Sequence, residues 1–356
     1  MHFFTFLHFF TFLRFFLLRV AGRRVCYNKA MSSPLVIRRL VPACLLLLLL
    51  PPLLAGCGKS LTTAKVQDTL AEALRRAQVD PDDKGARRYV DSAIALAPND
   101  PATYFGDPGG AVPEIGVAAV FEAVGDDPAL IDYMTQAVQK FPDDYRGGQL
   151  LVDALGRQGR TAEKRAAAAN LVALLTKKLQ APGVANIPTL TASLARAYFD
   201  AGDAANGAAQ YKKVISAYPA LSSYPNDLGP YNGLAYGYAE ANTHLPEALG
   251  LAQKALALVQ HSSSNTKDEE IPAVQDTLGW VQHRMGDDKN AEQNLLEAVG
   301  TDPREPELRF HLGTVYAAEG KTDAARAEFG HAVLLCPGYA AAQQALDGLP
   351  KPSASS

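Results

Sequence analysis

A repeat of 34 residues constrains the fold of this 356-residue chain more than any other feature. Seven positions of the C-terminal half carry the same or a similar residue 34 positions further on. They are Leu278, Gly279, Gly286, Ala291, Leu295, Ala298 and Pro303, matched by Leu312, Gly313, Gly320, Ala325, Phe329, Ala332 and Pro337. A period of this length is typical of a solenoid, in which each repeat buries its apolar face against the next.

The spacing inside each repeat is helical. Ala325, Phe329 and Ala332 step by four and three residues, as on one face of an α-helix. Gly320 marks a break between two helices, and Pro337 ends the second helix. We therefore predict pairs of antiparallel helices, with small residues where the two helices touch.

The order of these residues resembles the tetratricopeptide repeat. The shared pattern is a Leu-Gly pair, a Tyr three residues later, then Ala, an aromatic residue, Ala and a closing Pro. The resemblance implies an all-α fold, namely an α-solenoid of antiparallel helix pairs in a right-handed superhelix. Four units follow the pattern, at 188–221, 228–262, 272–305 and 306–339. Residues 262–264 and 267–270 are expected to extend the loop after the second of these units.

The first half of the chain carries the pattern weakly. We interpret 65–187 as a degenerate region of similar helices, with a Pro- and Gly-rich insertion at 99–116 that cannot be continuous helix. We expect about six repeats in all, by analogy with the clear units. A capping helix is predicted at 340–348 and a disordered tail at 349–356.

Residues 34–57 have the pattern of a signal peptide. Arg38 and Arg39 precede an apolar run, 40–54, which is shorter than the ~20 residues of a membrane-spanning helix. The run ends in Leu-Ala-Gly-Cys, which resembles the bacterial lipobox and implies cleavage before Cys57 and acylation of that residue. We thus interpret 31–56 as a lipoprotein signal peptide and 57–64 as a tether. The alternative is a plain secretory signal or a membrane anchor, in which Cys57 has no role.

Residues 1–30 form an unusual Phe-rich extension before this signal. Eight of the fourteen Phe residues of the chain lie there, and Met31 would begin a signal peptide of ordinary length. We interpret 1–30 as an upstream extension that results from a misplaced start codon. A second hydrophobic segment is the alternative, although Arg14 and Arg19 interrupt it.

Charge restricts the partners of the remaining chain. Residues 57–356 contain 27 basic and 37 acidic residues, a net charge of −10. Nucleic acid is not expected as a partner, because phosphate binding needs clustered Lys and Arg. Gly58 follows the lipid-bearing position, and in lipoproteins that the lipobox resembles this implies the outer rather than the inner membrane. The expected location is the cell envelope, with the chain lipid-anchored on the periplasmic side.

Signatures of catalysis are missing from the sequence. It contains no His-Glu-x-x-His, Gly-x-Ser-x-Gly or Cys-x-x-Cys pattern. His283, His311 and His331 have no spacing that fixes a metal-ligand set. Cys336 is interpreted as a small, semi-buried residue. We expect no catalytic residue, metal site, cofactor or small-molecule substrate.

Recognition is then the expected role, through the first helix of each repeat. In the family that this chain resembles, a stripe on those helices lines a concave groove. The predicted groove residues are Arg196, Phe199, Asn232, Tyr236, Asp276, Trp280, His283, Arg284, Phe310 and Thr314. Trp280, the single Trp of the chain, has an alternative interpretation as a packing residue between adjacent repeats.

The sequence therefore predicts a non-enzymatic scaffold that binds a protein or peptide partner in this groove. Similar repeat lipoproteins serve in envelope assembly, secretion or polysaccharide export, and the sequence does not choose among these. Two alternatives stay open. One is a carbohydrate- or peptidoglycan-binding envelope protein that uses groove aromatics, and the other is the accessory domain of an enzyme, with chemistry in 99–145.

Overall fold

A computed structural model describes residues 61–79, 84–106, 114–217, 228–261 and 267–350. The chain divides into two units, 1–65 and 66–356, and each is considered by itself. The predicted upstream extension, the signal peptide, Cys57 and Gly58 lie outside the described residues, as do 351–356 of the predicted tail.

The described residues form sixteen helices and no strand, as the all-α prediction requires. They are α3 (Leu61–Val79), α4 (Lys84–Leu96), α5 (Pro101–Phe105), α6 (Val117–Glu122), α7 (Asp127–Lys140), α8 (Tyr145–Arg157), α9 (Thr161–Gln180), α10 (Ile187–Asp200), α11 (Ala204–Ala217), α12 (Gly229–Glu240), α13 (Leu245–Gln260), α14 (Lys267–Arg284), α15 (Asp288–Thr301), α16 (Pro306–Ala318), α17 (Thr322–Leu335) and α18 (Ala340–Gly348). None of the helices in these ranges is both long and apolar enough to cross a membrane.

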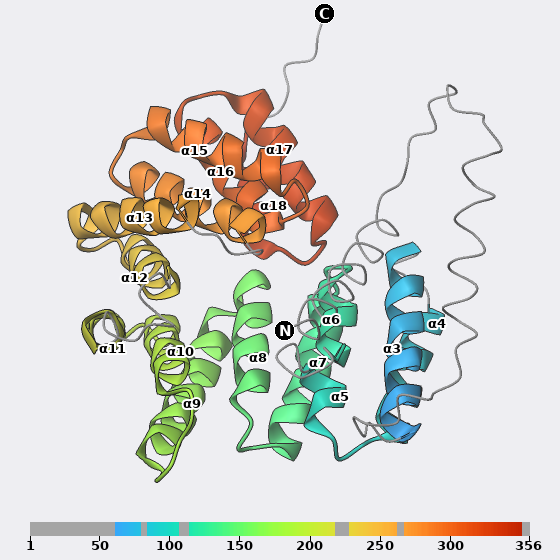
Figure 1. The fold of residues 1–356 in the computed structure, drawn as a ribbon. Helices are drawn as coiled ribbons and strands as arrows, with labels where there is room; N and C mark the ends of the chain where they lie inside the picture. The colour runs from blue at the N-terminus through green and yellow to red at the C-terminus, as the bar shows by residue number, and fades with distance from the viewer. Residues whose placement is uncertain (1–60, 80–83, 107–113, 218–227, 262–266, 351–356) are drawn as a thin grey trace, which may run out of the picture. The chain divides into compact units, whose positions relative to one another are not determined.

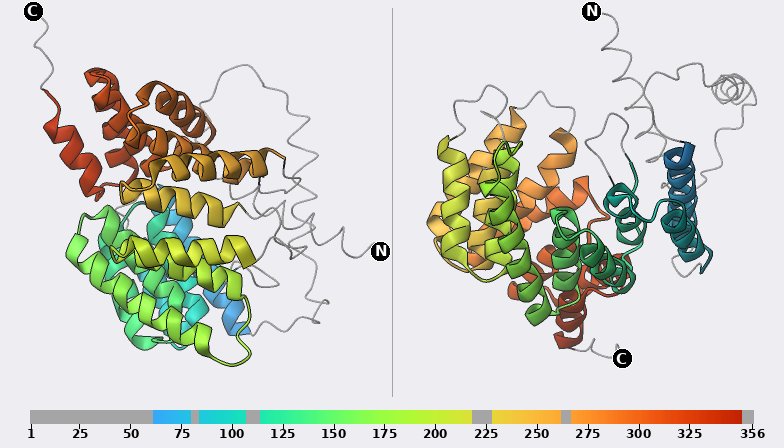
Figure 2. Two further views of the ribbon diagram at one scale, coloured as in Figure 1. Left: turned by 90° about the vertical axis from the view of Figure 1, so that its left-hand side faces the viewer. Right: turned by 90° about the horizontal axis from the view of Figure 1, so that it is seen from below.

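Consecutive helices pack in pairs. The pairs α10–α11, α12–α13, α14–α15 and α16–α17 cover the four clear sequence repeats, and each pair packs against the next. Gly320 stands between α16 and α17 at φ 76°, a left-handed conformation that glycine adopts without steric cost. Figures 1 and 2 show these pairs following one another, with α18 returning to the side of α8.

Close contact between small and aromatic residues holds each pair together. A Cβ atom added to Gly313 of α16 would lie 2.7 Å from the ring of Phe329 in α17, whose side chain is buried. Gly279 of α14 has the same relation to Leu295 of α15, at 2.8 Å. The recurring Gly of the sequence motif is therefore the residue that lets the two helices approach each other.

The N-terminal region differs from the expectation in two places. Residues 61–64 begin α3, so the predicted tether does not extend through them. Within the predicted insertion, 101–105 form α5, because Asp100 caps its N-terminus and Pro101 occupies the first turn. The buried side chains of α5 join the core, so this part of the insertion is packed structure rather than loop.

A third correction concerns the loop after α13. The prediction of loop at 267–270 is wrong, because α14 begins at Lys267 and contains Pro272. Residues 262–264 lie outside the described residues.

Candidate protein-binding groove

The predicted groove residues lie on α10, α12, α14 and α16, but their burial differs greatly. Arg196 is exposed, whereas Asp276 and Trp280 are buried. The other predicted residues, which are Phe199, Asn232, Tyr236, His283, Arg284, Phe310 and Thr314, are half-buried.

Three separate hydrogen bonds join α12, α14 and α16, the first helices of three successive repeats. The Tyr236 hydroxyl of α12 donates to Glu307 of α16 at 2.5 Å. The indole N–H of Trp280 in α14 donates to Glu240 of α12 at 2.8 Å. His311 of α16 lies with Nδ1 2.8 Å from a carboxylate oxygen of Asp276 in α14. We call these six residues the aromatic–acidic network.

Trp280 contributes mainly packing to this network. Its side chain is only 6% exposed, and its ring stacks on His311 at 4.2 Å between centroids and on His283 at 5.1 Å. The indole therefore packs against two histidine rings, one from its own helix and one from α16. This placement favours the interpretation of Trp280 as a packing residue between adjacent repeats, with only its N–H group directed to a groove carboxylate.

The His311–Asp276 pair carries a buried charge. Burial disfavours the charged imidazole, but Asp276, Glu307 and Glu240 outweigh it and raise the pKa of His311 to about 9. Burial, together with Glu307 and Glu240, raises the pKa of Tyr236 well above its ordinary value. With His311 charged and three carboxylates around it, the aromatic–acidic network is negative overall.

Glu240 and Glu307 have no basic partner within ion-pair distance among the described residues. The neighbouring Glu305 shares this property, and burial together with Glu307 raises its pKa to about 7. Such carboxylates attract a cation electrostatically.

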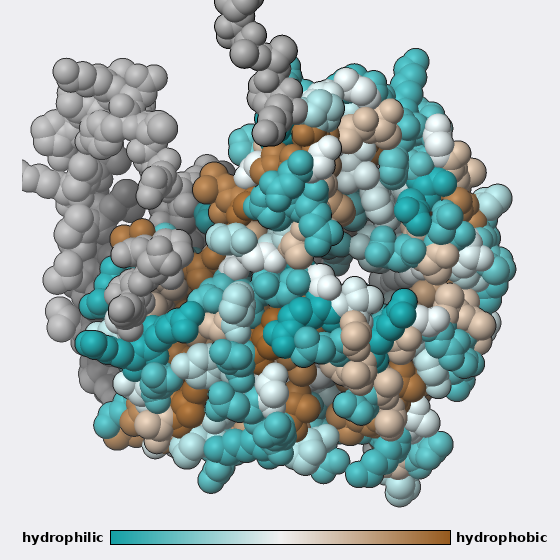
Figure 3. All heavy atoms as spheres, turned by 180° about the vertical axis from the view of Figure 1, so that it is seen from behind, coloured by the Kyte–Doolittle hydropathy of each residue, from teal (hydrophilic) through white to brown (hydrophobic). Residues whose placement is uncertain are grey.

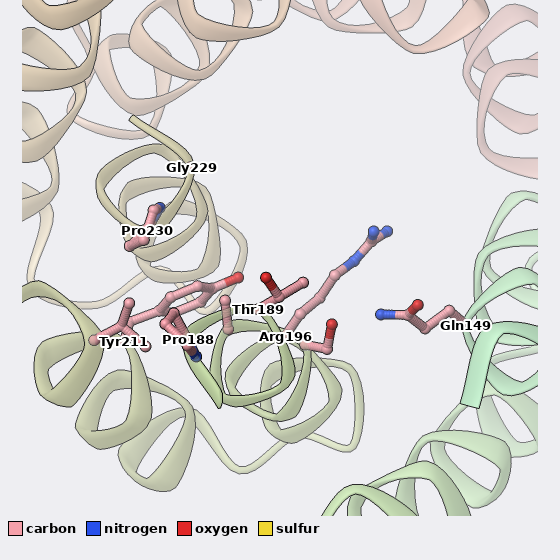
Figure 4. A pocket seen from close by; sticks show the side chains of 10 residues that line it. Gln149, Pro188, Thr189, Arg196, Tyr211, Gly229 and Pro230 are labelled. Carbon is pink, nitrogen blue, oxygen red and sulfur yellow. The ribbon is translucent and has the colours of Figure 1, made fainter. Parts of the chain in front are cut away.

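A pocket of about 280 Å³ lies between α8, α10, α11 and α12. Its lining residues are Gln149, Pro188, Thr189, Ala192, Ser193, Arg196, Tyr211, Val214, Gly229 and Pro230. Figure 4 shows the side chains of Arg196 and Gln149 extending from different helices into the same space. Arg196 also bonds to Asp153 of α8 at 2.6 Å, and this carboxylate raises the pKa of its guanidinium.

Several predicted groove residues make packing contacts or hydrogen bonds with other residues of the repeat array. Phe199 fills the space over two glycines, since added Cβ atoms at Gly207 and Gly237 would lie 2.6 and 2.7 Å from its ring. Arg284 donates to the Ala239 carbonyl, at 3.1 Å. The Thr314 hydroxyl donates to the carbonyl of Phe310 in its own helix, at 2.8 Å.

The last two polar residues of the predicted groove, His283 and Asn232, are not freely exposed either. His283 pairs with Asp288 at 2.6 Å. Asn232 of α12 has a buried side-chain oxygen with no hydrogen-bond partner among the described residues. The described residues also include no group of three or more His, Cys, Asp and Glu placed to hold a metal ion.

The sequence analysis missed Glu240, Glu307 and the groove role of His311. Glu240 lies one turn after Tyr236, and Glu307 lies three residues before Phe310, so helical spacing from a predicted residue could have found both. What spacing could not show is that α12 and α16, two repeats apart, come close enough to bond directly.

Together, the 34-residue motif and the helix pairs define the class of this molecule: an all-α array of repeated helix pairs, whose sequence motif resembles the tetratricopeptide repeat. A tetratricopeptide repeat protein from Parabacteroides merdae ATCC 43184 matches with a TM-score of 0.45 and 10% identity, over 80% of this chain and 98% of that chain. The thermophilic repeat protein TTC0263 from Thermus thermophilus matches with a TM-score of 0.41 and 19% identity, over 57% of this chain and 99% of that chain.

A third solved structure, the APC/C hetero-tetramer Cut9–Hcn1, has a TM-score of 0.41 and 14% identity and covers 80% of this chain. The match spans only about half of that longer chain, 53%. No protein-family model and no curated protein matches the sequence.

Proposed function

We propose that this protein is a non-catalytic scaffold that binds a segment of another protein on the groove face of α8, α10, α12, α14 and α16. One observation carries the proposal. The unpaired carboxylates of the aromatic–acidic network and the pocket beside Arg196 lie on the same set of first helices. Stacked repeats use such a face for recognition, and the surface offers both charge and a cavity.

The partner segment carries Lys or Arg. Glu240 and Glu307 are oriented by Trp280 and Tyr236, so their carboxylates are held in place before a ligand arrives. A preorganised charge costs little ordering entropy on binding. Charge complementarity of this kind mainly raises the association rate.

We further propose that the protein acts in the cell envelope, attached by lipid on Cys57 and located at the outer membrane. The lipobox-like sequence and Gly58 support this part of the proposal. The class of machinery is envelope assembly, secretion or polysaccharide export. Intact-mass measurement of protein purified from membranes tests the anchor: the mature chain should begin at Cys57 and carry acyl mass, and Cys57→Ala should leave an uncleaved precursor. A mature N-terminus elsewhere contradicts the anchor.

A paired-variant pull-down from detergent-solubilised envelope tests the binding face. Glu240→Gln with Glu307→Gln removes two groove charges, and we expect about tenfold weaker capture of the specific partner. The matched control is Asp323→Asn with Asp347→Asn, which removes two exposed charges from α17 and α18. Equal capture by both double variants would exclude the groove carboxylates as the binding site.

A further inference from the structure

The segment after α17 contacts helices far earlier in the chain. The side-chain amide of Gln158, at the end of α8, donates to the Gly338 carbonyl at 2.7 Å. The thiol of Cys336 lies 3.4 Å from a carboxylate oxygen of Asp127, the first residue of α7. About 180 to 210 residues separate these partners, whereas most contacts of a repeat array join neighbouring units.

The contact is closely fitted. A Cβ added to Gly125 would lie 2.7 Å from the Leu335 carbonyl oxygen and 2.8 Å from the Cα of Cys336. A Cβ added to Gly159 would lie 3.0 Å from that of Ala340. Backbone meets backbone without room for a side chain, which is the packing of a formed interface rather than of a chance encounter.

A buried ion pair lies at its centre. Asp127 is 1% exposed and receives three hydrogen bonds of 2.6 to 3.0 Å from the guanidinium of Arg157. Cys336 is 2% exposed, and burial and Asp127 raise the pKa of its thiol to about 12, so the thiol is protonated and can donate. Separating the two sides removes the thiol and the backbone of 335–338 from this pair.

The same contact brings α16, which is the first helix of the last repeat, near the first helices of earlier repeats. Arg196 of α10 bonds to Asp153 of α8, and α10, α12, α14 and α16 contact one another in that order. The helix that follows the contact, α18, packs against both α17 and α16. The first helices α8, α10, α12, α14 and α16 therefore surround a common interior. Figure 3 shows that the surface seen from behind is hollowed and largely hydrophilic.

We propose that the contact of 125–127 and 157–159 with 335–340 is a latch: it closes these five first helices into a ring, opens without unfolding the repeats, and controls the access of a partner to the interior. The last of these three statements rests on the proposed function, while the first two do not. The admitted partner is an extended segment with a cationic side chain, because the exposed carboxylates Glu240, Glu305 and Glu307 lack basic partners among the described residues.

Thiol labelling of the full chain, read at Cys336 by peptide mass spectrometry, tests the latch directly. We expect Cys336 to react at least about tenfold more slowly than a Cys placed at the exposed Gln344 in a Cys336→Ala background. Because Asp127 also raises the pKa of the thiol, the rates are compared after division by the thiolate fraction, taken from the pH dependence of labelling in each variant. On that basis Asp127→Asn should raise the Cys336 rate by about 100-fold, since loss of one partner of a buried ion pair shifts an equilibrium by two or more factors of ten. Gln158→Ala, which removes one hydrogen bond, should raise it about threefold to tenfold.

A matched control separates latch opening from unfolding. Leu234→Ala destabilises the array at a fully buried site of α12, away from the latch. It should leave Cys336 labelling under native conditions close to wild type, while Asp127→Asn keeps its helix content by circular dichroism. Hydrogen exchange should show joint loss of protection at 123–130 and 336–342 in Asp127→Asn. Labelling that rises equally in both variants, or that is already as fast as at the exposed site, overturns the latch.

The control of access is tested with unstructured twelve-residue Gly/Ser peptides that carry two Arg, two Glu or no charge. The Arg peptide should bind in preference to the others, and Asp127→Asn should increase its association rate constant about tenfold. If the Arg peptide binds at the same rate to both proteins, access control is wrong and the proposed function stands. If no peptide binds while the labelling results hold, the proposed function and the access control fail, and closure and local opening of the ring stand.

Discussion

The helix pairs α10–α17 and the helices α3–α9 reach the same packing arrangement by different means. In the C-terminal pairs, one motif recurs, with a small residue of the first helix under a large residue of the second, as in Gly313 and Phe329. In the N-terminal helices, the core is mostly aliphatic and includes aromatic rings, such as Tyr104 and Phe105 of α5, which pack against Phe141 at 5.2 and 6.0 Å between centroids. The comparison teaches that helix pairing survives the loss of the repeat motif when other large side chains fill the same space.

The largest expected effect tests whether damage in the C-terminal pairs stays local. Phe329→Ala removes a ring that is 2% exposed and should cost about 3–5 kcal/mol of unfolding free energy. Because repeats contact mainly their neighbours, hydrogen exchange should show the loss of protection concentrated in α14–α18. Chemical denaturation gives the size of the effect. A uniform loss over all the described helices would show instead that the latch makes the array one cooperative unit.

The second effect concerns the buried His311–Asp276 pair of the C-terminal groove helices. Between pH 6.5, its ordinary pKa, and about 9, folded His311 holds its proton while the unfolded chain releases it. Stability from the His311–Asp276 pair is therefore complete below pH 6.5 and is lost as the pH rises to about 9, by about 1–3 kcal/mol. Denaturant titrations at several pH values measure this slope. His311→Gln should abolish it, and an unchanged slope in that variant would assign the pH dependence to other groups.

The third effect asks whether the N-terminal helices share the close approach seen in the C-terminal motif. A Cβ at Gly147 of α8 would lie 2.7 Å from the Phe105 ring, the same distance as that from Gly313 to Phe329. Gly147→Ala and Gly313→Ala should each cost about 1–3 kcal/mol through overpacking. Melting temperatures of the two variants check this. A loss of stability in Gly313→Ala alone would mean that the N-terminal helices can accommodate an added methyl group.

The sequence predicted the fold better for the C-terminal pairs α10–α17 than for the N-terminal helices α3–α9. The Gly, Ala and Pro positions of 188–339 were sufficient to predict helix pairs there, because helix contact demands small residues at fixed spacing. In 61–157 the spacing is irregular, so α5 was taken for loop and the start of α3 for a tether. Asp100 and Pro101 are a sequence signal for a helix start that the Pro and Gly content of the insertion obscured.

The candidate site was predictable to the level of the helix face but not of its contacts. Tyr236 and Asp276 were on the predicted stripe, whereas their partners Glu307 and His311 come from helices that meet only through the rotation between successive repeats. That rotation accumulates from small packing differences at each interface, which no local spacing encodes. The latch at Cys336 depends on the same accumulated rotation over several pairs, so the sequence indicated only a semi-buried cysteine.

The smallest expected effect is a gain in stability, and it compares an exposed glycine, Gly250, with the closely packed Gly313. Gly250 is exposed in the middle of α13, and an added Cβ would meet no atom within 4 Å. Gly250→Ala should therefore stabilise the protein by about 0.5–1 kcal/mol, since alanine has the better helix propensity and loses less backbone entropy on folding. Denaturation measured beside Gly313→Ala provides the matched pair, identical in chemistry and different only in the space around the new methyl group. If both substitutions shifted stability in the same direction, close helix approach would not be the reason for glycine in the repeat motif.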